Sequence, residues 1–309
     1  MKNKLTTLAV LYAFAAGFSY AGDAAVKLTK EEGKISVELN GKPFTTYYVS
    51  EAFGAPYVRP FFYPVLAADG TPVTDDQIQT RGDHPHHRSL WVAHGEVNDA
   101  DHWSLKGDKM PKQRHVAFTK VEGDTIEQQL EWEGKDGQPM LKETRTWRFS
   151  AYSDGTPAID LTSVYDPVVD KVTFRDTKEA GLISVRVVKP LAMTALVTNA
   201  AGGKGEKECW GKPAAWCDIS GKVKGNVYGI AMFDHPSNPR HPSTWHVREY
   251  GLMGANIFGL SYFDKKNAKG AGDFTIEKGK PVTFKYRVVI HQGDATAAGL
   301  DAKYKEWAK

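Results

Sequence analysis

Alternation between apolar and polar residues recurs along the chain, and this period of two constrains the fold more than any other feature. In residues 125–132, Ile126, Leu130 and Trp132 share one face while glutamates take the other. Such alternation is typical of strands that pack one face against a core. Similar runs, separated by clusters of Gly, Pro, Asn and Asp, lie at 35–39, 44–49, 142–149, 158–164, 172–175, 182–188, 227–233, 257–263 and 281–291.

The strand pattern predicts an all-β fold, a large antiparallel β-sandwich. No long linker interrupts it, so we expect one domain. In residues 281–291, Lys285, Arg287 and His291 share the polar face. This face is expected to line a cleft.

The last segment carries the one strong helical pattern. Leu300, Tyr304 and Trp307 recur at helical spacing after Asp294, which we expect to cap the helix N-terminus. The sequence therefore predicts a C-terminal helix that covers an open sheet edge.

Residues 1–21 have the pattern of a secretory signal peptide. Lys2 and Lys4 precede an apolar run over residues 5–18, and small residues mark a cleavage site. We therefore expect a periplasmic or secreted protein whose mature chain, residues 22–309, is a single β-sandwich domain.

Composition limits the partners. Removal of Lys2 and Lys4 lowers the formal net charge from +3 to +1, which argues against a nucleic-acid surface. No run reaches the roughly 18 continuous apolar residues of a membrane span. The expected partner is a small molecule or an oligosaccharide, and the oligomeric state is left open.

Four of the ten histidines lie between positions 84 and 94. Imidazole is a common metal ligand and exchanges protons near neutral pH. In an extended segment, His84 and His86 would project to one side and His87 to the other, while Pro85 disfavours a central strand.

Two interpretations of the histidine cluster stay open. In the first, His84 and His86 bind a divalent metal (Zn, Ca, Mn or Cu), with His94, Asp83 or His291 as a third ligand, and the preferred set is His84, His86 and His94. In the second, no metal is bound and the histidines form a polar pocket that contacts a ligand directly.

A second stretch rich in His and Pro, residues 234–250, begins with the same Asp-His-Pro triplet as residues 83–85. We expect the two stretches to form opposite walls of one cleft, with His246 among the functional side chains.

Arginines and aromatic residues flank both stretches. Aromatic faces stack on sugar rings, and guanidinium groups bind hydroxyls or carboxylates. Alternatively, the aromatic residues belong to the core and the arginines form surface ion pairs. The predicted substrate-binding residues are Arg59, Arg88, Trp91, Asn98, Trp103, Arg240, Trp245, Arg248 and Tyr250.

Residues 176–179, Asp-Thr-Lys-Glu, form a turn between two expected strands. Lys178 and Glu179 are candidates for proton transfer, although such residues are also common in ordinary turns. Cys209 and Cys217 are expected to be structural, as either a disulfide or two buried thiols, and a metal or redox role stays open as the alternative.

Several long motifs carry a resemblance to a known family. They are residues 59–64, 83–91, 176–179, 216–218, 234–240 and 245–251. In these motifs the chain resembles the family labelled "methane oxygenase PmoA". The label implies a copper-dependent oxygenase, whereas the family's members resemble exported proteins of polysaccharide-degrading bacteria and are similar to the super-sandwiches of mutarotase-like and lyase-like proteins.

The leading prediction is an exported carbohydrate-active enzyme, a hydrolase, lyase or isomerase. The alternatives are a glycan-binding protein without catalysis and a copper-dependent oxidoreductase. The candidate catalytic residues are His84, His86, His87, Lys178, Glu179 and His246.

Overall fold

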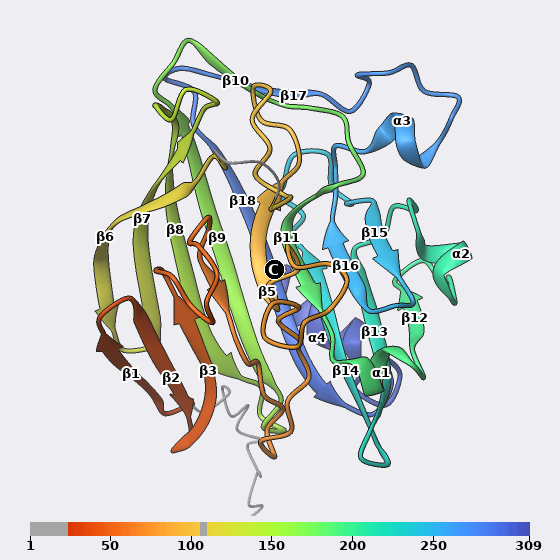
Figure 1. The fold of residues 1–309 in the computed structure, drawn as a ribbon. Coiled ribbons are helices and arrows are strands. Elements are labelled where there is room, and N and C mark those ends of the chain that lie inside the picture. Colours follow the sequence, from red (N-terminus) through yellow and green to blue (C-terminus); the bar gives the residue numbers. More distant parts are fainter. Residues whose placement is uncertain (1–23, 106–109) are drawn as a thin grey trace, which may run out of the picture.

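Two eight-stranded sheets face each other and enclose the main core (Figure 1). The computed structural model describes residues 24–105 and 110–309, so the predicted signal peptide lies outside the described residues. All strand pairs that it describes are antiparallel. The predicted antiparallel β-sandwich with a C-terminal helix is therefore confirmed.

The first sheet carries the candidate site. Its strands, in spatial order, are β1 (Val26–Glu31), β2 (Lys34–Leu39), β3 (Lys42–Tyr48), β4 (Phe61–Phe62), β5 (Leu90–His94), β11 (Ala180–Arg186), β16 (Leu252–Ala255) and β15 (Trp245–Arg248).

The second sheet covers the inner face of the first. Its strands, in spatial order, are β12 (Leu196–Asn199), β13 (Trp216–Val223), β14 (Asn226–Asp234), β18 (Val282–Gln292), β9 (Pro157–Pro167), β8 (Pro139–Ala151), β7 (Thr125–Glu133) and β6 (Gln113–Glu122). A separate ribbon pairs β10 (Lys171–Phe174) with β17 (Phe274–Glu277). The helices are α1 (Lys189–Ala192), α2 (Glu206–Cys209), α3 (Leu260–Phe263) and α4 (Leu300–Trp307).

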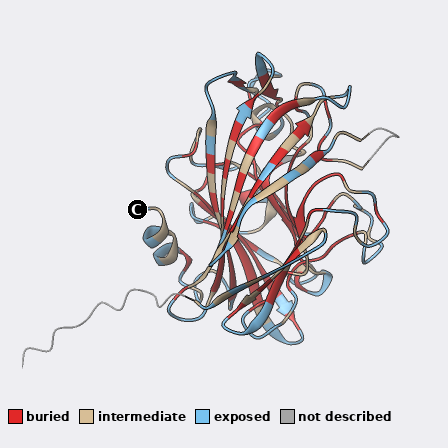
Figure 2. Cartoon of the chain, turned by 90° about the vertical axis from the view of Figure 1, so that its left-hand side faces the viewer, coloured by how far each residue is buried: buried red, intermediate tan, exposed pale blue. Residues whose placement is uncertain are grey.

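Buried residues, red in Figure 2, run along the strands of both sheets. Their side chains form the main core between the sheets. Tyr47 of the first sheet packs edge-on against Trp147 of the second, with ring centroids 6.1 Å apart. Its hydroxyl donates to Gln128 Oε1 at 2.5 Å. The inward-facing residues that the alternation predicted thus form the contacts between the two sheets.

A fully buried ion pair lies within this interior. Glu143 and Arg145 are two residues apart on β8 and therefore share its inward face. Arg145 donates to Gln113 Oε1 at 3.0 Å, and Gln113 donates to the carbonyl of Val92 on β5 at 2.9 Å. These contacts connect the second sheet to a site-bearing strand of the first.

Helix α4 covers the outer face of the second sheet and not an edge, contrary to the prediction. Tyr304 and Trp307 pack against Phe233 of β14, with centroids 5.5 and 6.1 Å away. Gly299 (φ 63°) is the N-cap, while Asp294 accepts the Ala297 N–H in the preceding turn. Helical spacing identified the apolar side of the helix but did not determine the surface that it covers.

The polar face of β18 was predicted to line a cleft, but of its three polar residues only His291 lines a described pocket, one of about 270 Å³. Arg287 binds Asp160 through two hydrogen bonds of 2.6 and 2.7 Å, and its guanidinium lies over the Trp307 ring. His291 is buried and lies 2.9 Å from Asp218 Oδ1. Around Val289 the outer face of this strand is covered because α4 and its neighbours build a small second core, whereas Thr283 at the start of the strand is exposed.

The strand predicted over residues 257–263 is also wrong. The strand β16 ends at Ala255, and the helix α3 begins at Leu260. Asn256 Oδ1 accepts the N–H groups of Phe258 and Gly259 at 2.8 and 2.9 Å. A side-chain acceptor thus takes donors that a continuing strand would offer to its neighbour.

Cys209 and Cys217 are two buried, free thiols, so the second of the two predicted alternatives holds. Among the described residues, no helix is long and apolar enough to cross a membrane.

Candidate functional site

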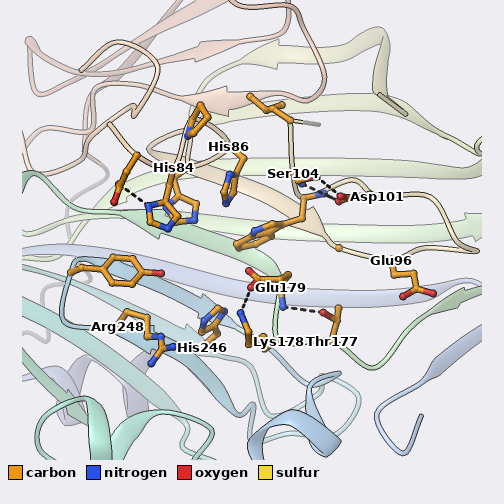
Figure 3. A pocket seen from close by; sticks show the side chains of 17 residues that line it. His84, His86, Glu96, Asp101, Ser104, Thr177, Lys178, Glu179, His246 and Arg248 are labelled. Atoms are coloured by element: carbon orange, nitrogen blue, oxygen red, sulfur yellow. Dashed lines mark hydrogen bonds and ion pairs between the residues drawn. The ribbon is translucent and has the colours of Figure 1, made fainter. Parts of the chain in front are cut away.

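A cleft of about 740 Å³ lies on the outer face of the first sheet (Figure 3). Alternation along the strands directs His246 and Arg248 of β15 away from the core, whereas Trp245 and Val247 point into it. Loops complete the cleft, which is lined by Asp83, His84, Pro85, His86, His87, Gly95, Glu96, Asp101, Trp103, Ser104, Leu105, Thr177, Lys178, Glu179, His246, Arg248 and Tyr250.

The histidine cluster forms a tight turn and not the extended segment that was predicted. The N–H of His87 donates to the carbonyl of His84 at 2.8 Å, and Pro85 occupies the second position of the turn, which it favours. Because the turn brings its first and fourth residues together, His84 and His87 stack with centroids 4.8 Å apart. His86 lies beside them, 4.4 Å from the His87 ring.

Four rings form a continuous stack that fixes this turn. Tyr250 lies over His84 at 5.4 Å, His84 over His87, and His87 over Trp91 at 5.5 Å, with interplanar angles of 16°, 8° and 22°. Trp91 belongs to β5 and is buried. The stack therefore anchors the histidine turn to a rigid strand.

Arg59 supports the turn from behind. Its guanidinium donates to the carbonyls of His86, His102 and Trp103 at 2.7, 2.8 and 2.9 Å. Arg59 is buried and does not line the cleft. It was predicted to bind substrate, but it holds the backbone on which His86 and Trp103 are mounted.

The opposite wall is the turn that enters β11. Lys178 and Glu179 form an ion pair there. Asn256 fixes this turn, because its side-chain amide donates to the carbonyls of Thr177 and Lys178 at 3.0 and 3.2 Å. His246 is buried in the same wall.

Burial keeps three of the cleft histidines, His86, His87 and His246, uncharged at neutral pH. Desolvation lowers the pKa of His86 to about 4, although the charge of Glu179 opposes this shift. Desolvation likewise lowers the pKa of His246 to about 4, again opposed by Glu179. The pKa of His87 is lowered as well, mainly by burial. Its Nδ1 lies 3.2 Å from Arg186 Nη1, a donor, so its proton is on Nε2.

Acid should destabilise the protein through its buried histidines. The pKa values of His94, His102 and His246 are lowered by burial from 6.5 to about 3, 3 and 4. The unfolded chain therefore binds protons that the folded protein does not. Stability should be highest above pH 6.5 and fall toward pH 4, by about 1.4 kcal/mol per pH unit for each such histidine.

Urea unfolding at steps across this pH range measures the effect. A His102→Gln variant, whose amide can still donate to the Glu133 carbonyl that His102 Nε2 contacts at 2.9 Å, should show a shallower slope. Stability that does not change with pH in the wild-type protein would contradict the expectation.

Besides Arg59, four predicted substrate-binding residues are structural. Arg88 is buried and binds Asp76 at 2.8 and 3.2 Å. Arg240 donates to three backbone carbonyls. Trp245 is buried and donates to the Ala214 carbonyl, and Trp91 forms the base of the ring stack. The alternative interpretation, that such residues serve packing and structural pairing, holds for these four.

Asn98 also lies outside the cleft, since its side chain joins the backbone of Lys171 and Thr173 on β10. Of the predicted binding residues, the cleft brings together Trp103, Arg248 and Tyr250. Arg248 is ion-paired with Glu206 and lies over the Trp210 ring. All six candidate catalytic residues line the cleft.

The predicted metal set of His84, His86 and His94 is not assembled. His94 is buried at the end of β5, where its Nε2 lies 2.9 Å from the Arg175 carbonyl oxygen. Within residues 24–105 and 110–309, no three His, Cys, Asp or Glu side chains are arranged to hold a metal ion. A bound divalent metal stays a prediction, which elemental analysis of the purified protein tests.

Only the end of the second His-Pro stretch reaches the cleft, through His246, Arg248 and Tyr250. Its beginning is structural, because Asp234 binds His241 at 2.8 Å and the Ser243 N–H at 2.7 Å. The prediction of two opposing walls is thus correct for part of this stretch.

Sequence reasoning missed Glu96, Asp101, Ser104 and Thr177, which also line the cleft. They lie on loops whose path the strand pattern does not determine. Arg186 was missed as well, although it belongs to an expected strand. Its neighbours Val185 and Val187 are core residues, so alternation directs it to the outer face.

Comparison with known proteins gives the family. The family described as "Family of unknown function (DUF6807)" matches residues 34–305. This match contradicts the resemblance to methane oxygenase PmoA, on which the copper oxidoreductase alternative rested. No curated protein matches the chain.

Three solved structures with remote similarity carry names from carbohydrate chemistry. A GalM/aldose epimerase homologue from C. elegans has a TM-score of 0.38 and 7% identity, covering 88% of this chain and 100% of its own. A polysaccharide lyase has a TM-score of 0.34 and 11% identity, covering 89% and 33%. A beta-arabinopyranosidase has a TM-score of 0.30 and 13% identity, covering 86% and 38%. The chain thus spans about a third of the lyase, and similarity this remote carries no argument about substrate.

Proposed function

The chain belongs to the DUF6807 family, and from its own cleft we propose that it is an enzyme which binds a sugar or glycan derivative and transfers a proton within it. The observation that carries this proposal is the place of Glu179 between two uncharged histidines. Figure 3 shows Glu179 between His86 on one wall and His246 on the other. Its charge acts on the pKa of both imidazoles.

This arrangement suits general acid–base catalysis. A carboxylate accepts a proton, and an uncharged imidazole can donate one and accept another. His246 lines the cleft, so its imidazole faces a ligand bound there. Lys178, paired with Glu179, supplies a cation beside the reacting groups.

The lining of the cleft favours a ligand with many hydroxyl groups. Carboxylates, hydroxyls, imidazoles and cations alternate around it, so donors and acceptors face the ligand from several sides. Its volume of about 740 Å³ is within the usual range for small-molecule sites. Tyr250, which is 42% exposed at the rim, offers an aromatic surface to a sugar ring.

We also propose that the protein acts in the periplasm or outside the cell, because the first 21 residues have the pattern of a signal peptide. Fractionation of cells that express the full chain, followed by N-terminal sequencing, tests this.

A panel of neutral and acidic mono- and oligosaccharides, followed by NMR for new products, tests the proposed activity. We expect the wild-type protein to convert at least one of them and a His246→Gln variant to convert it far more slowly. A Glu277→Gln variant, altered at an exposed residue of β17, serves as the control. Binding of a sugar without conversion would identify a glycan-binding protein and contradict the enzyme proposal.

A further inference from the structure

A second cavity of about 800 Å³ adjoins the cleft and shares Asp83 and Tyr250 with it. Its lining combines an apolar surface near α1 with three cations and two carboxylates. The apolar residues include Val188, Pro190, Ala192 and Met193, and the charged residues are Asp75, Arg81, Asp83, Arg186 and Lys189.

Arg186 is the buried cation of this cavity, only 9% exposed. Its guanidinium carbon lies 4.8 Å from the centroid of the Tyr250 ring, and Nη1 lies 3.2 Å from His87 Nδ1. Arg186 therefore contacts two residues that line the catalytic cleft. A ligand group held by Arg186 would lie next to the ring stack.

No carboxylate among the described residues forms an ion pair with Arg186. The two nearby acids are engaged elsewhere, since Asp75 accepts from Gln77 at 2.5 Å and Asp83 lies 2.7 Å from His84 Nδ1. Two other buried arginines are ion-paired, Arg88 with Asp76 and Arg145 with Glu143. A third, Arg59, has no carboxylate partner but donates to three backbone carbonyls, whereas the one hydrogen bond described for Arg186 is to His87.

An unpaired buried cation is costly, and burial lowers the pKa of Arg186. An anion supplied by a ligand would offset the free energy that burial of this unpaired charge costs. The main cleft itself is lined by four carboxylates and two cations, so an anionic group would be repelled there. The second cavity, with its excess of cations, is the favourable place for it.

We propose that this cavity is an anion subsite in which Arg186 binds an oxyanion carried by the substrate, a carboxylate or a sulfate or phosphate ester. The guanidinium presents a planar set of donors that suits such groups. Because the two cavities share Asp83 and Tyr250, one molecule can place its acidic group on Arg186 and its reacting sugar ring beside Glu179. The inference rests on the proposed function and narrows it to acidic sugar derivatives.

The test compares the binding of glucuronate, a sulfated glucose and glucose itself by calorimetry at matched ionic strength. The wild-type protein should bind at least one anionic sugar about 10- to 100-fold more tightly than glucose. An Arg186→Met variant should lose this preference, and Arg186→Lys should keep part of it. Whichever of the carboxylate and the sulfate ester binds more tightly identifies the group.

Two further measurements separate binding by Arg186 itself from a general effect of the cavity's positive charge and from a loss of protein stability. An Arg81→Met variant removes an exposed cation from the same cavity and should keep most of the preference. The ligand-free Arg186→Met protein should be at least as stable as the wild type, because it loses an unpaired buried charge. If Arg186→Met fails to fold, the affinities of the wild-type and Arg186→Lys proteins for the anionic sugars and for glucose still test the proposal.

The inference is overturned if the wild-type protein binds the anionic sugars no more tightly than glucose. It is also overturned if Arg81→Met abolishes the preference and Arg186→Met does not. Conversion of a neutral sugar without any anion preference would overturn the subsite alone and leave the proposed function intact. Tight binding of an anionic sugar without conversion of any sugar would support the subsite and contradict the proposed enzymatic function.

Discussion

A Glu179→Gln variant is expected to lose turnover by about 10²- to 10⁴-fold, the usual contribution of a general acid or base. Glutamine has nearly the same shape, so the substitution removes a proton acceptor without opening a hole. Lys178 loses its ion-pair partner, but its side chain is 36% exposed and water can solvate it. We therefore expect the fold to persist and the dissociation constant for the sugar to change only a few-fold.

The distinction between turnover and binding decides the role of Glu179. Steady-state kinetics give kcat, and calorimetry gives Kd, for the wild-type, Glu179→Gln and Glu277→Gln proteins. A Glu179→Gln variant that keeps a wild-type kcat would remove Glu179 from the chemistry. A variant that binds no sugar at all would assign Glu179 to binding.

Replacement of Arg145 by methionine should destabilise the protein by about 3–5 kcal/mol, because it leaves Glu143 buried without its cation. Both side chains are fully buried. Glu143 would retain hydrogen bonds from Trp132 Nε1 and the Ser163 hydroxyl, each at 2.7 Å, but these do not neutralise its charge. Urea unfolding of the wild-type and variant proteins measures the loss.

Two companion variants test the cause of this effect. A Glu143→Met, Arg145→Met double variant should be more stable than Arg145→Met alone, since no unpaired charge remains. An Arg114→Met variant, which breaks an exposed ion pair with Glu131 between β6 and β7, should cost about 1 kcal/mol or less. Equal losses for Arg114 and Arg145 would show that burial does not set the cost.

The strands were predictable because one face of each packs in the core and alternation records that face directly. Residues 125–132, for example, correspond to β7 (Thr125–Glu133). The pattern carries no information about what covers the outer face. It therefore placed α4 at an edge and directed Arg287 into a cleft, whereas the two pack against each other.

The site was predictable where unusual composition marked it and uncertain where common residue types were involved. The density of histidines led to His84, His86 and His87, and the charged turn led to Lys178 and Glu179. Arginines are different, because the same residue serves ligand binding and internal pairing. Arg88 is paired by Asp76, which lies in a loop that the sequence does not place. Arg186 has no such partner, and only the fold reveals this.

A crystal structure of the Glu179→Gln variant with the sugar that the wild-type protein converts tests the central claim most directly. Our account predicts that the ring lies in the cleft between His86 and His246, with its reacting atom within about 3.5 Å of the residue-179 side chain. A sugar bound elsewhere on the molecule, with the cleft between these histidines empty, would contradict it.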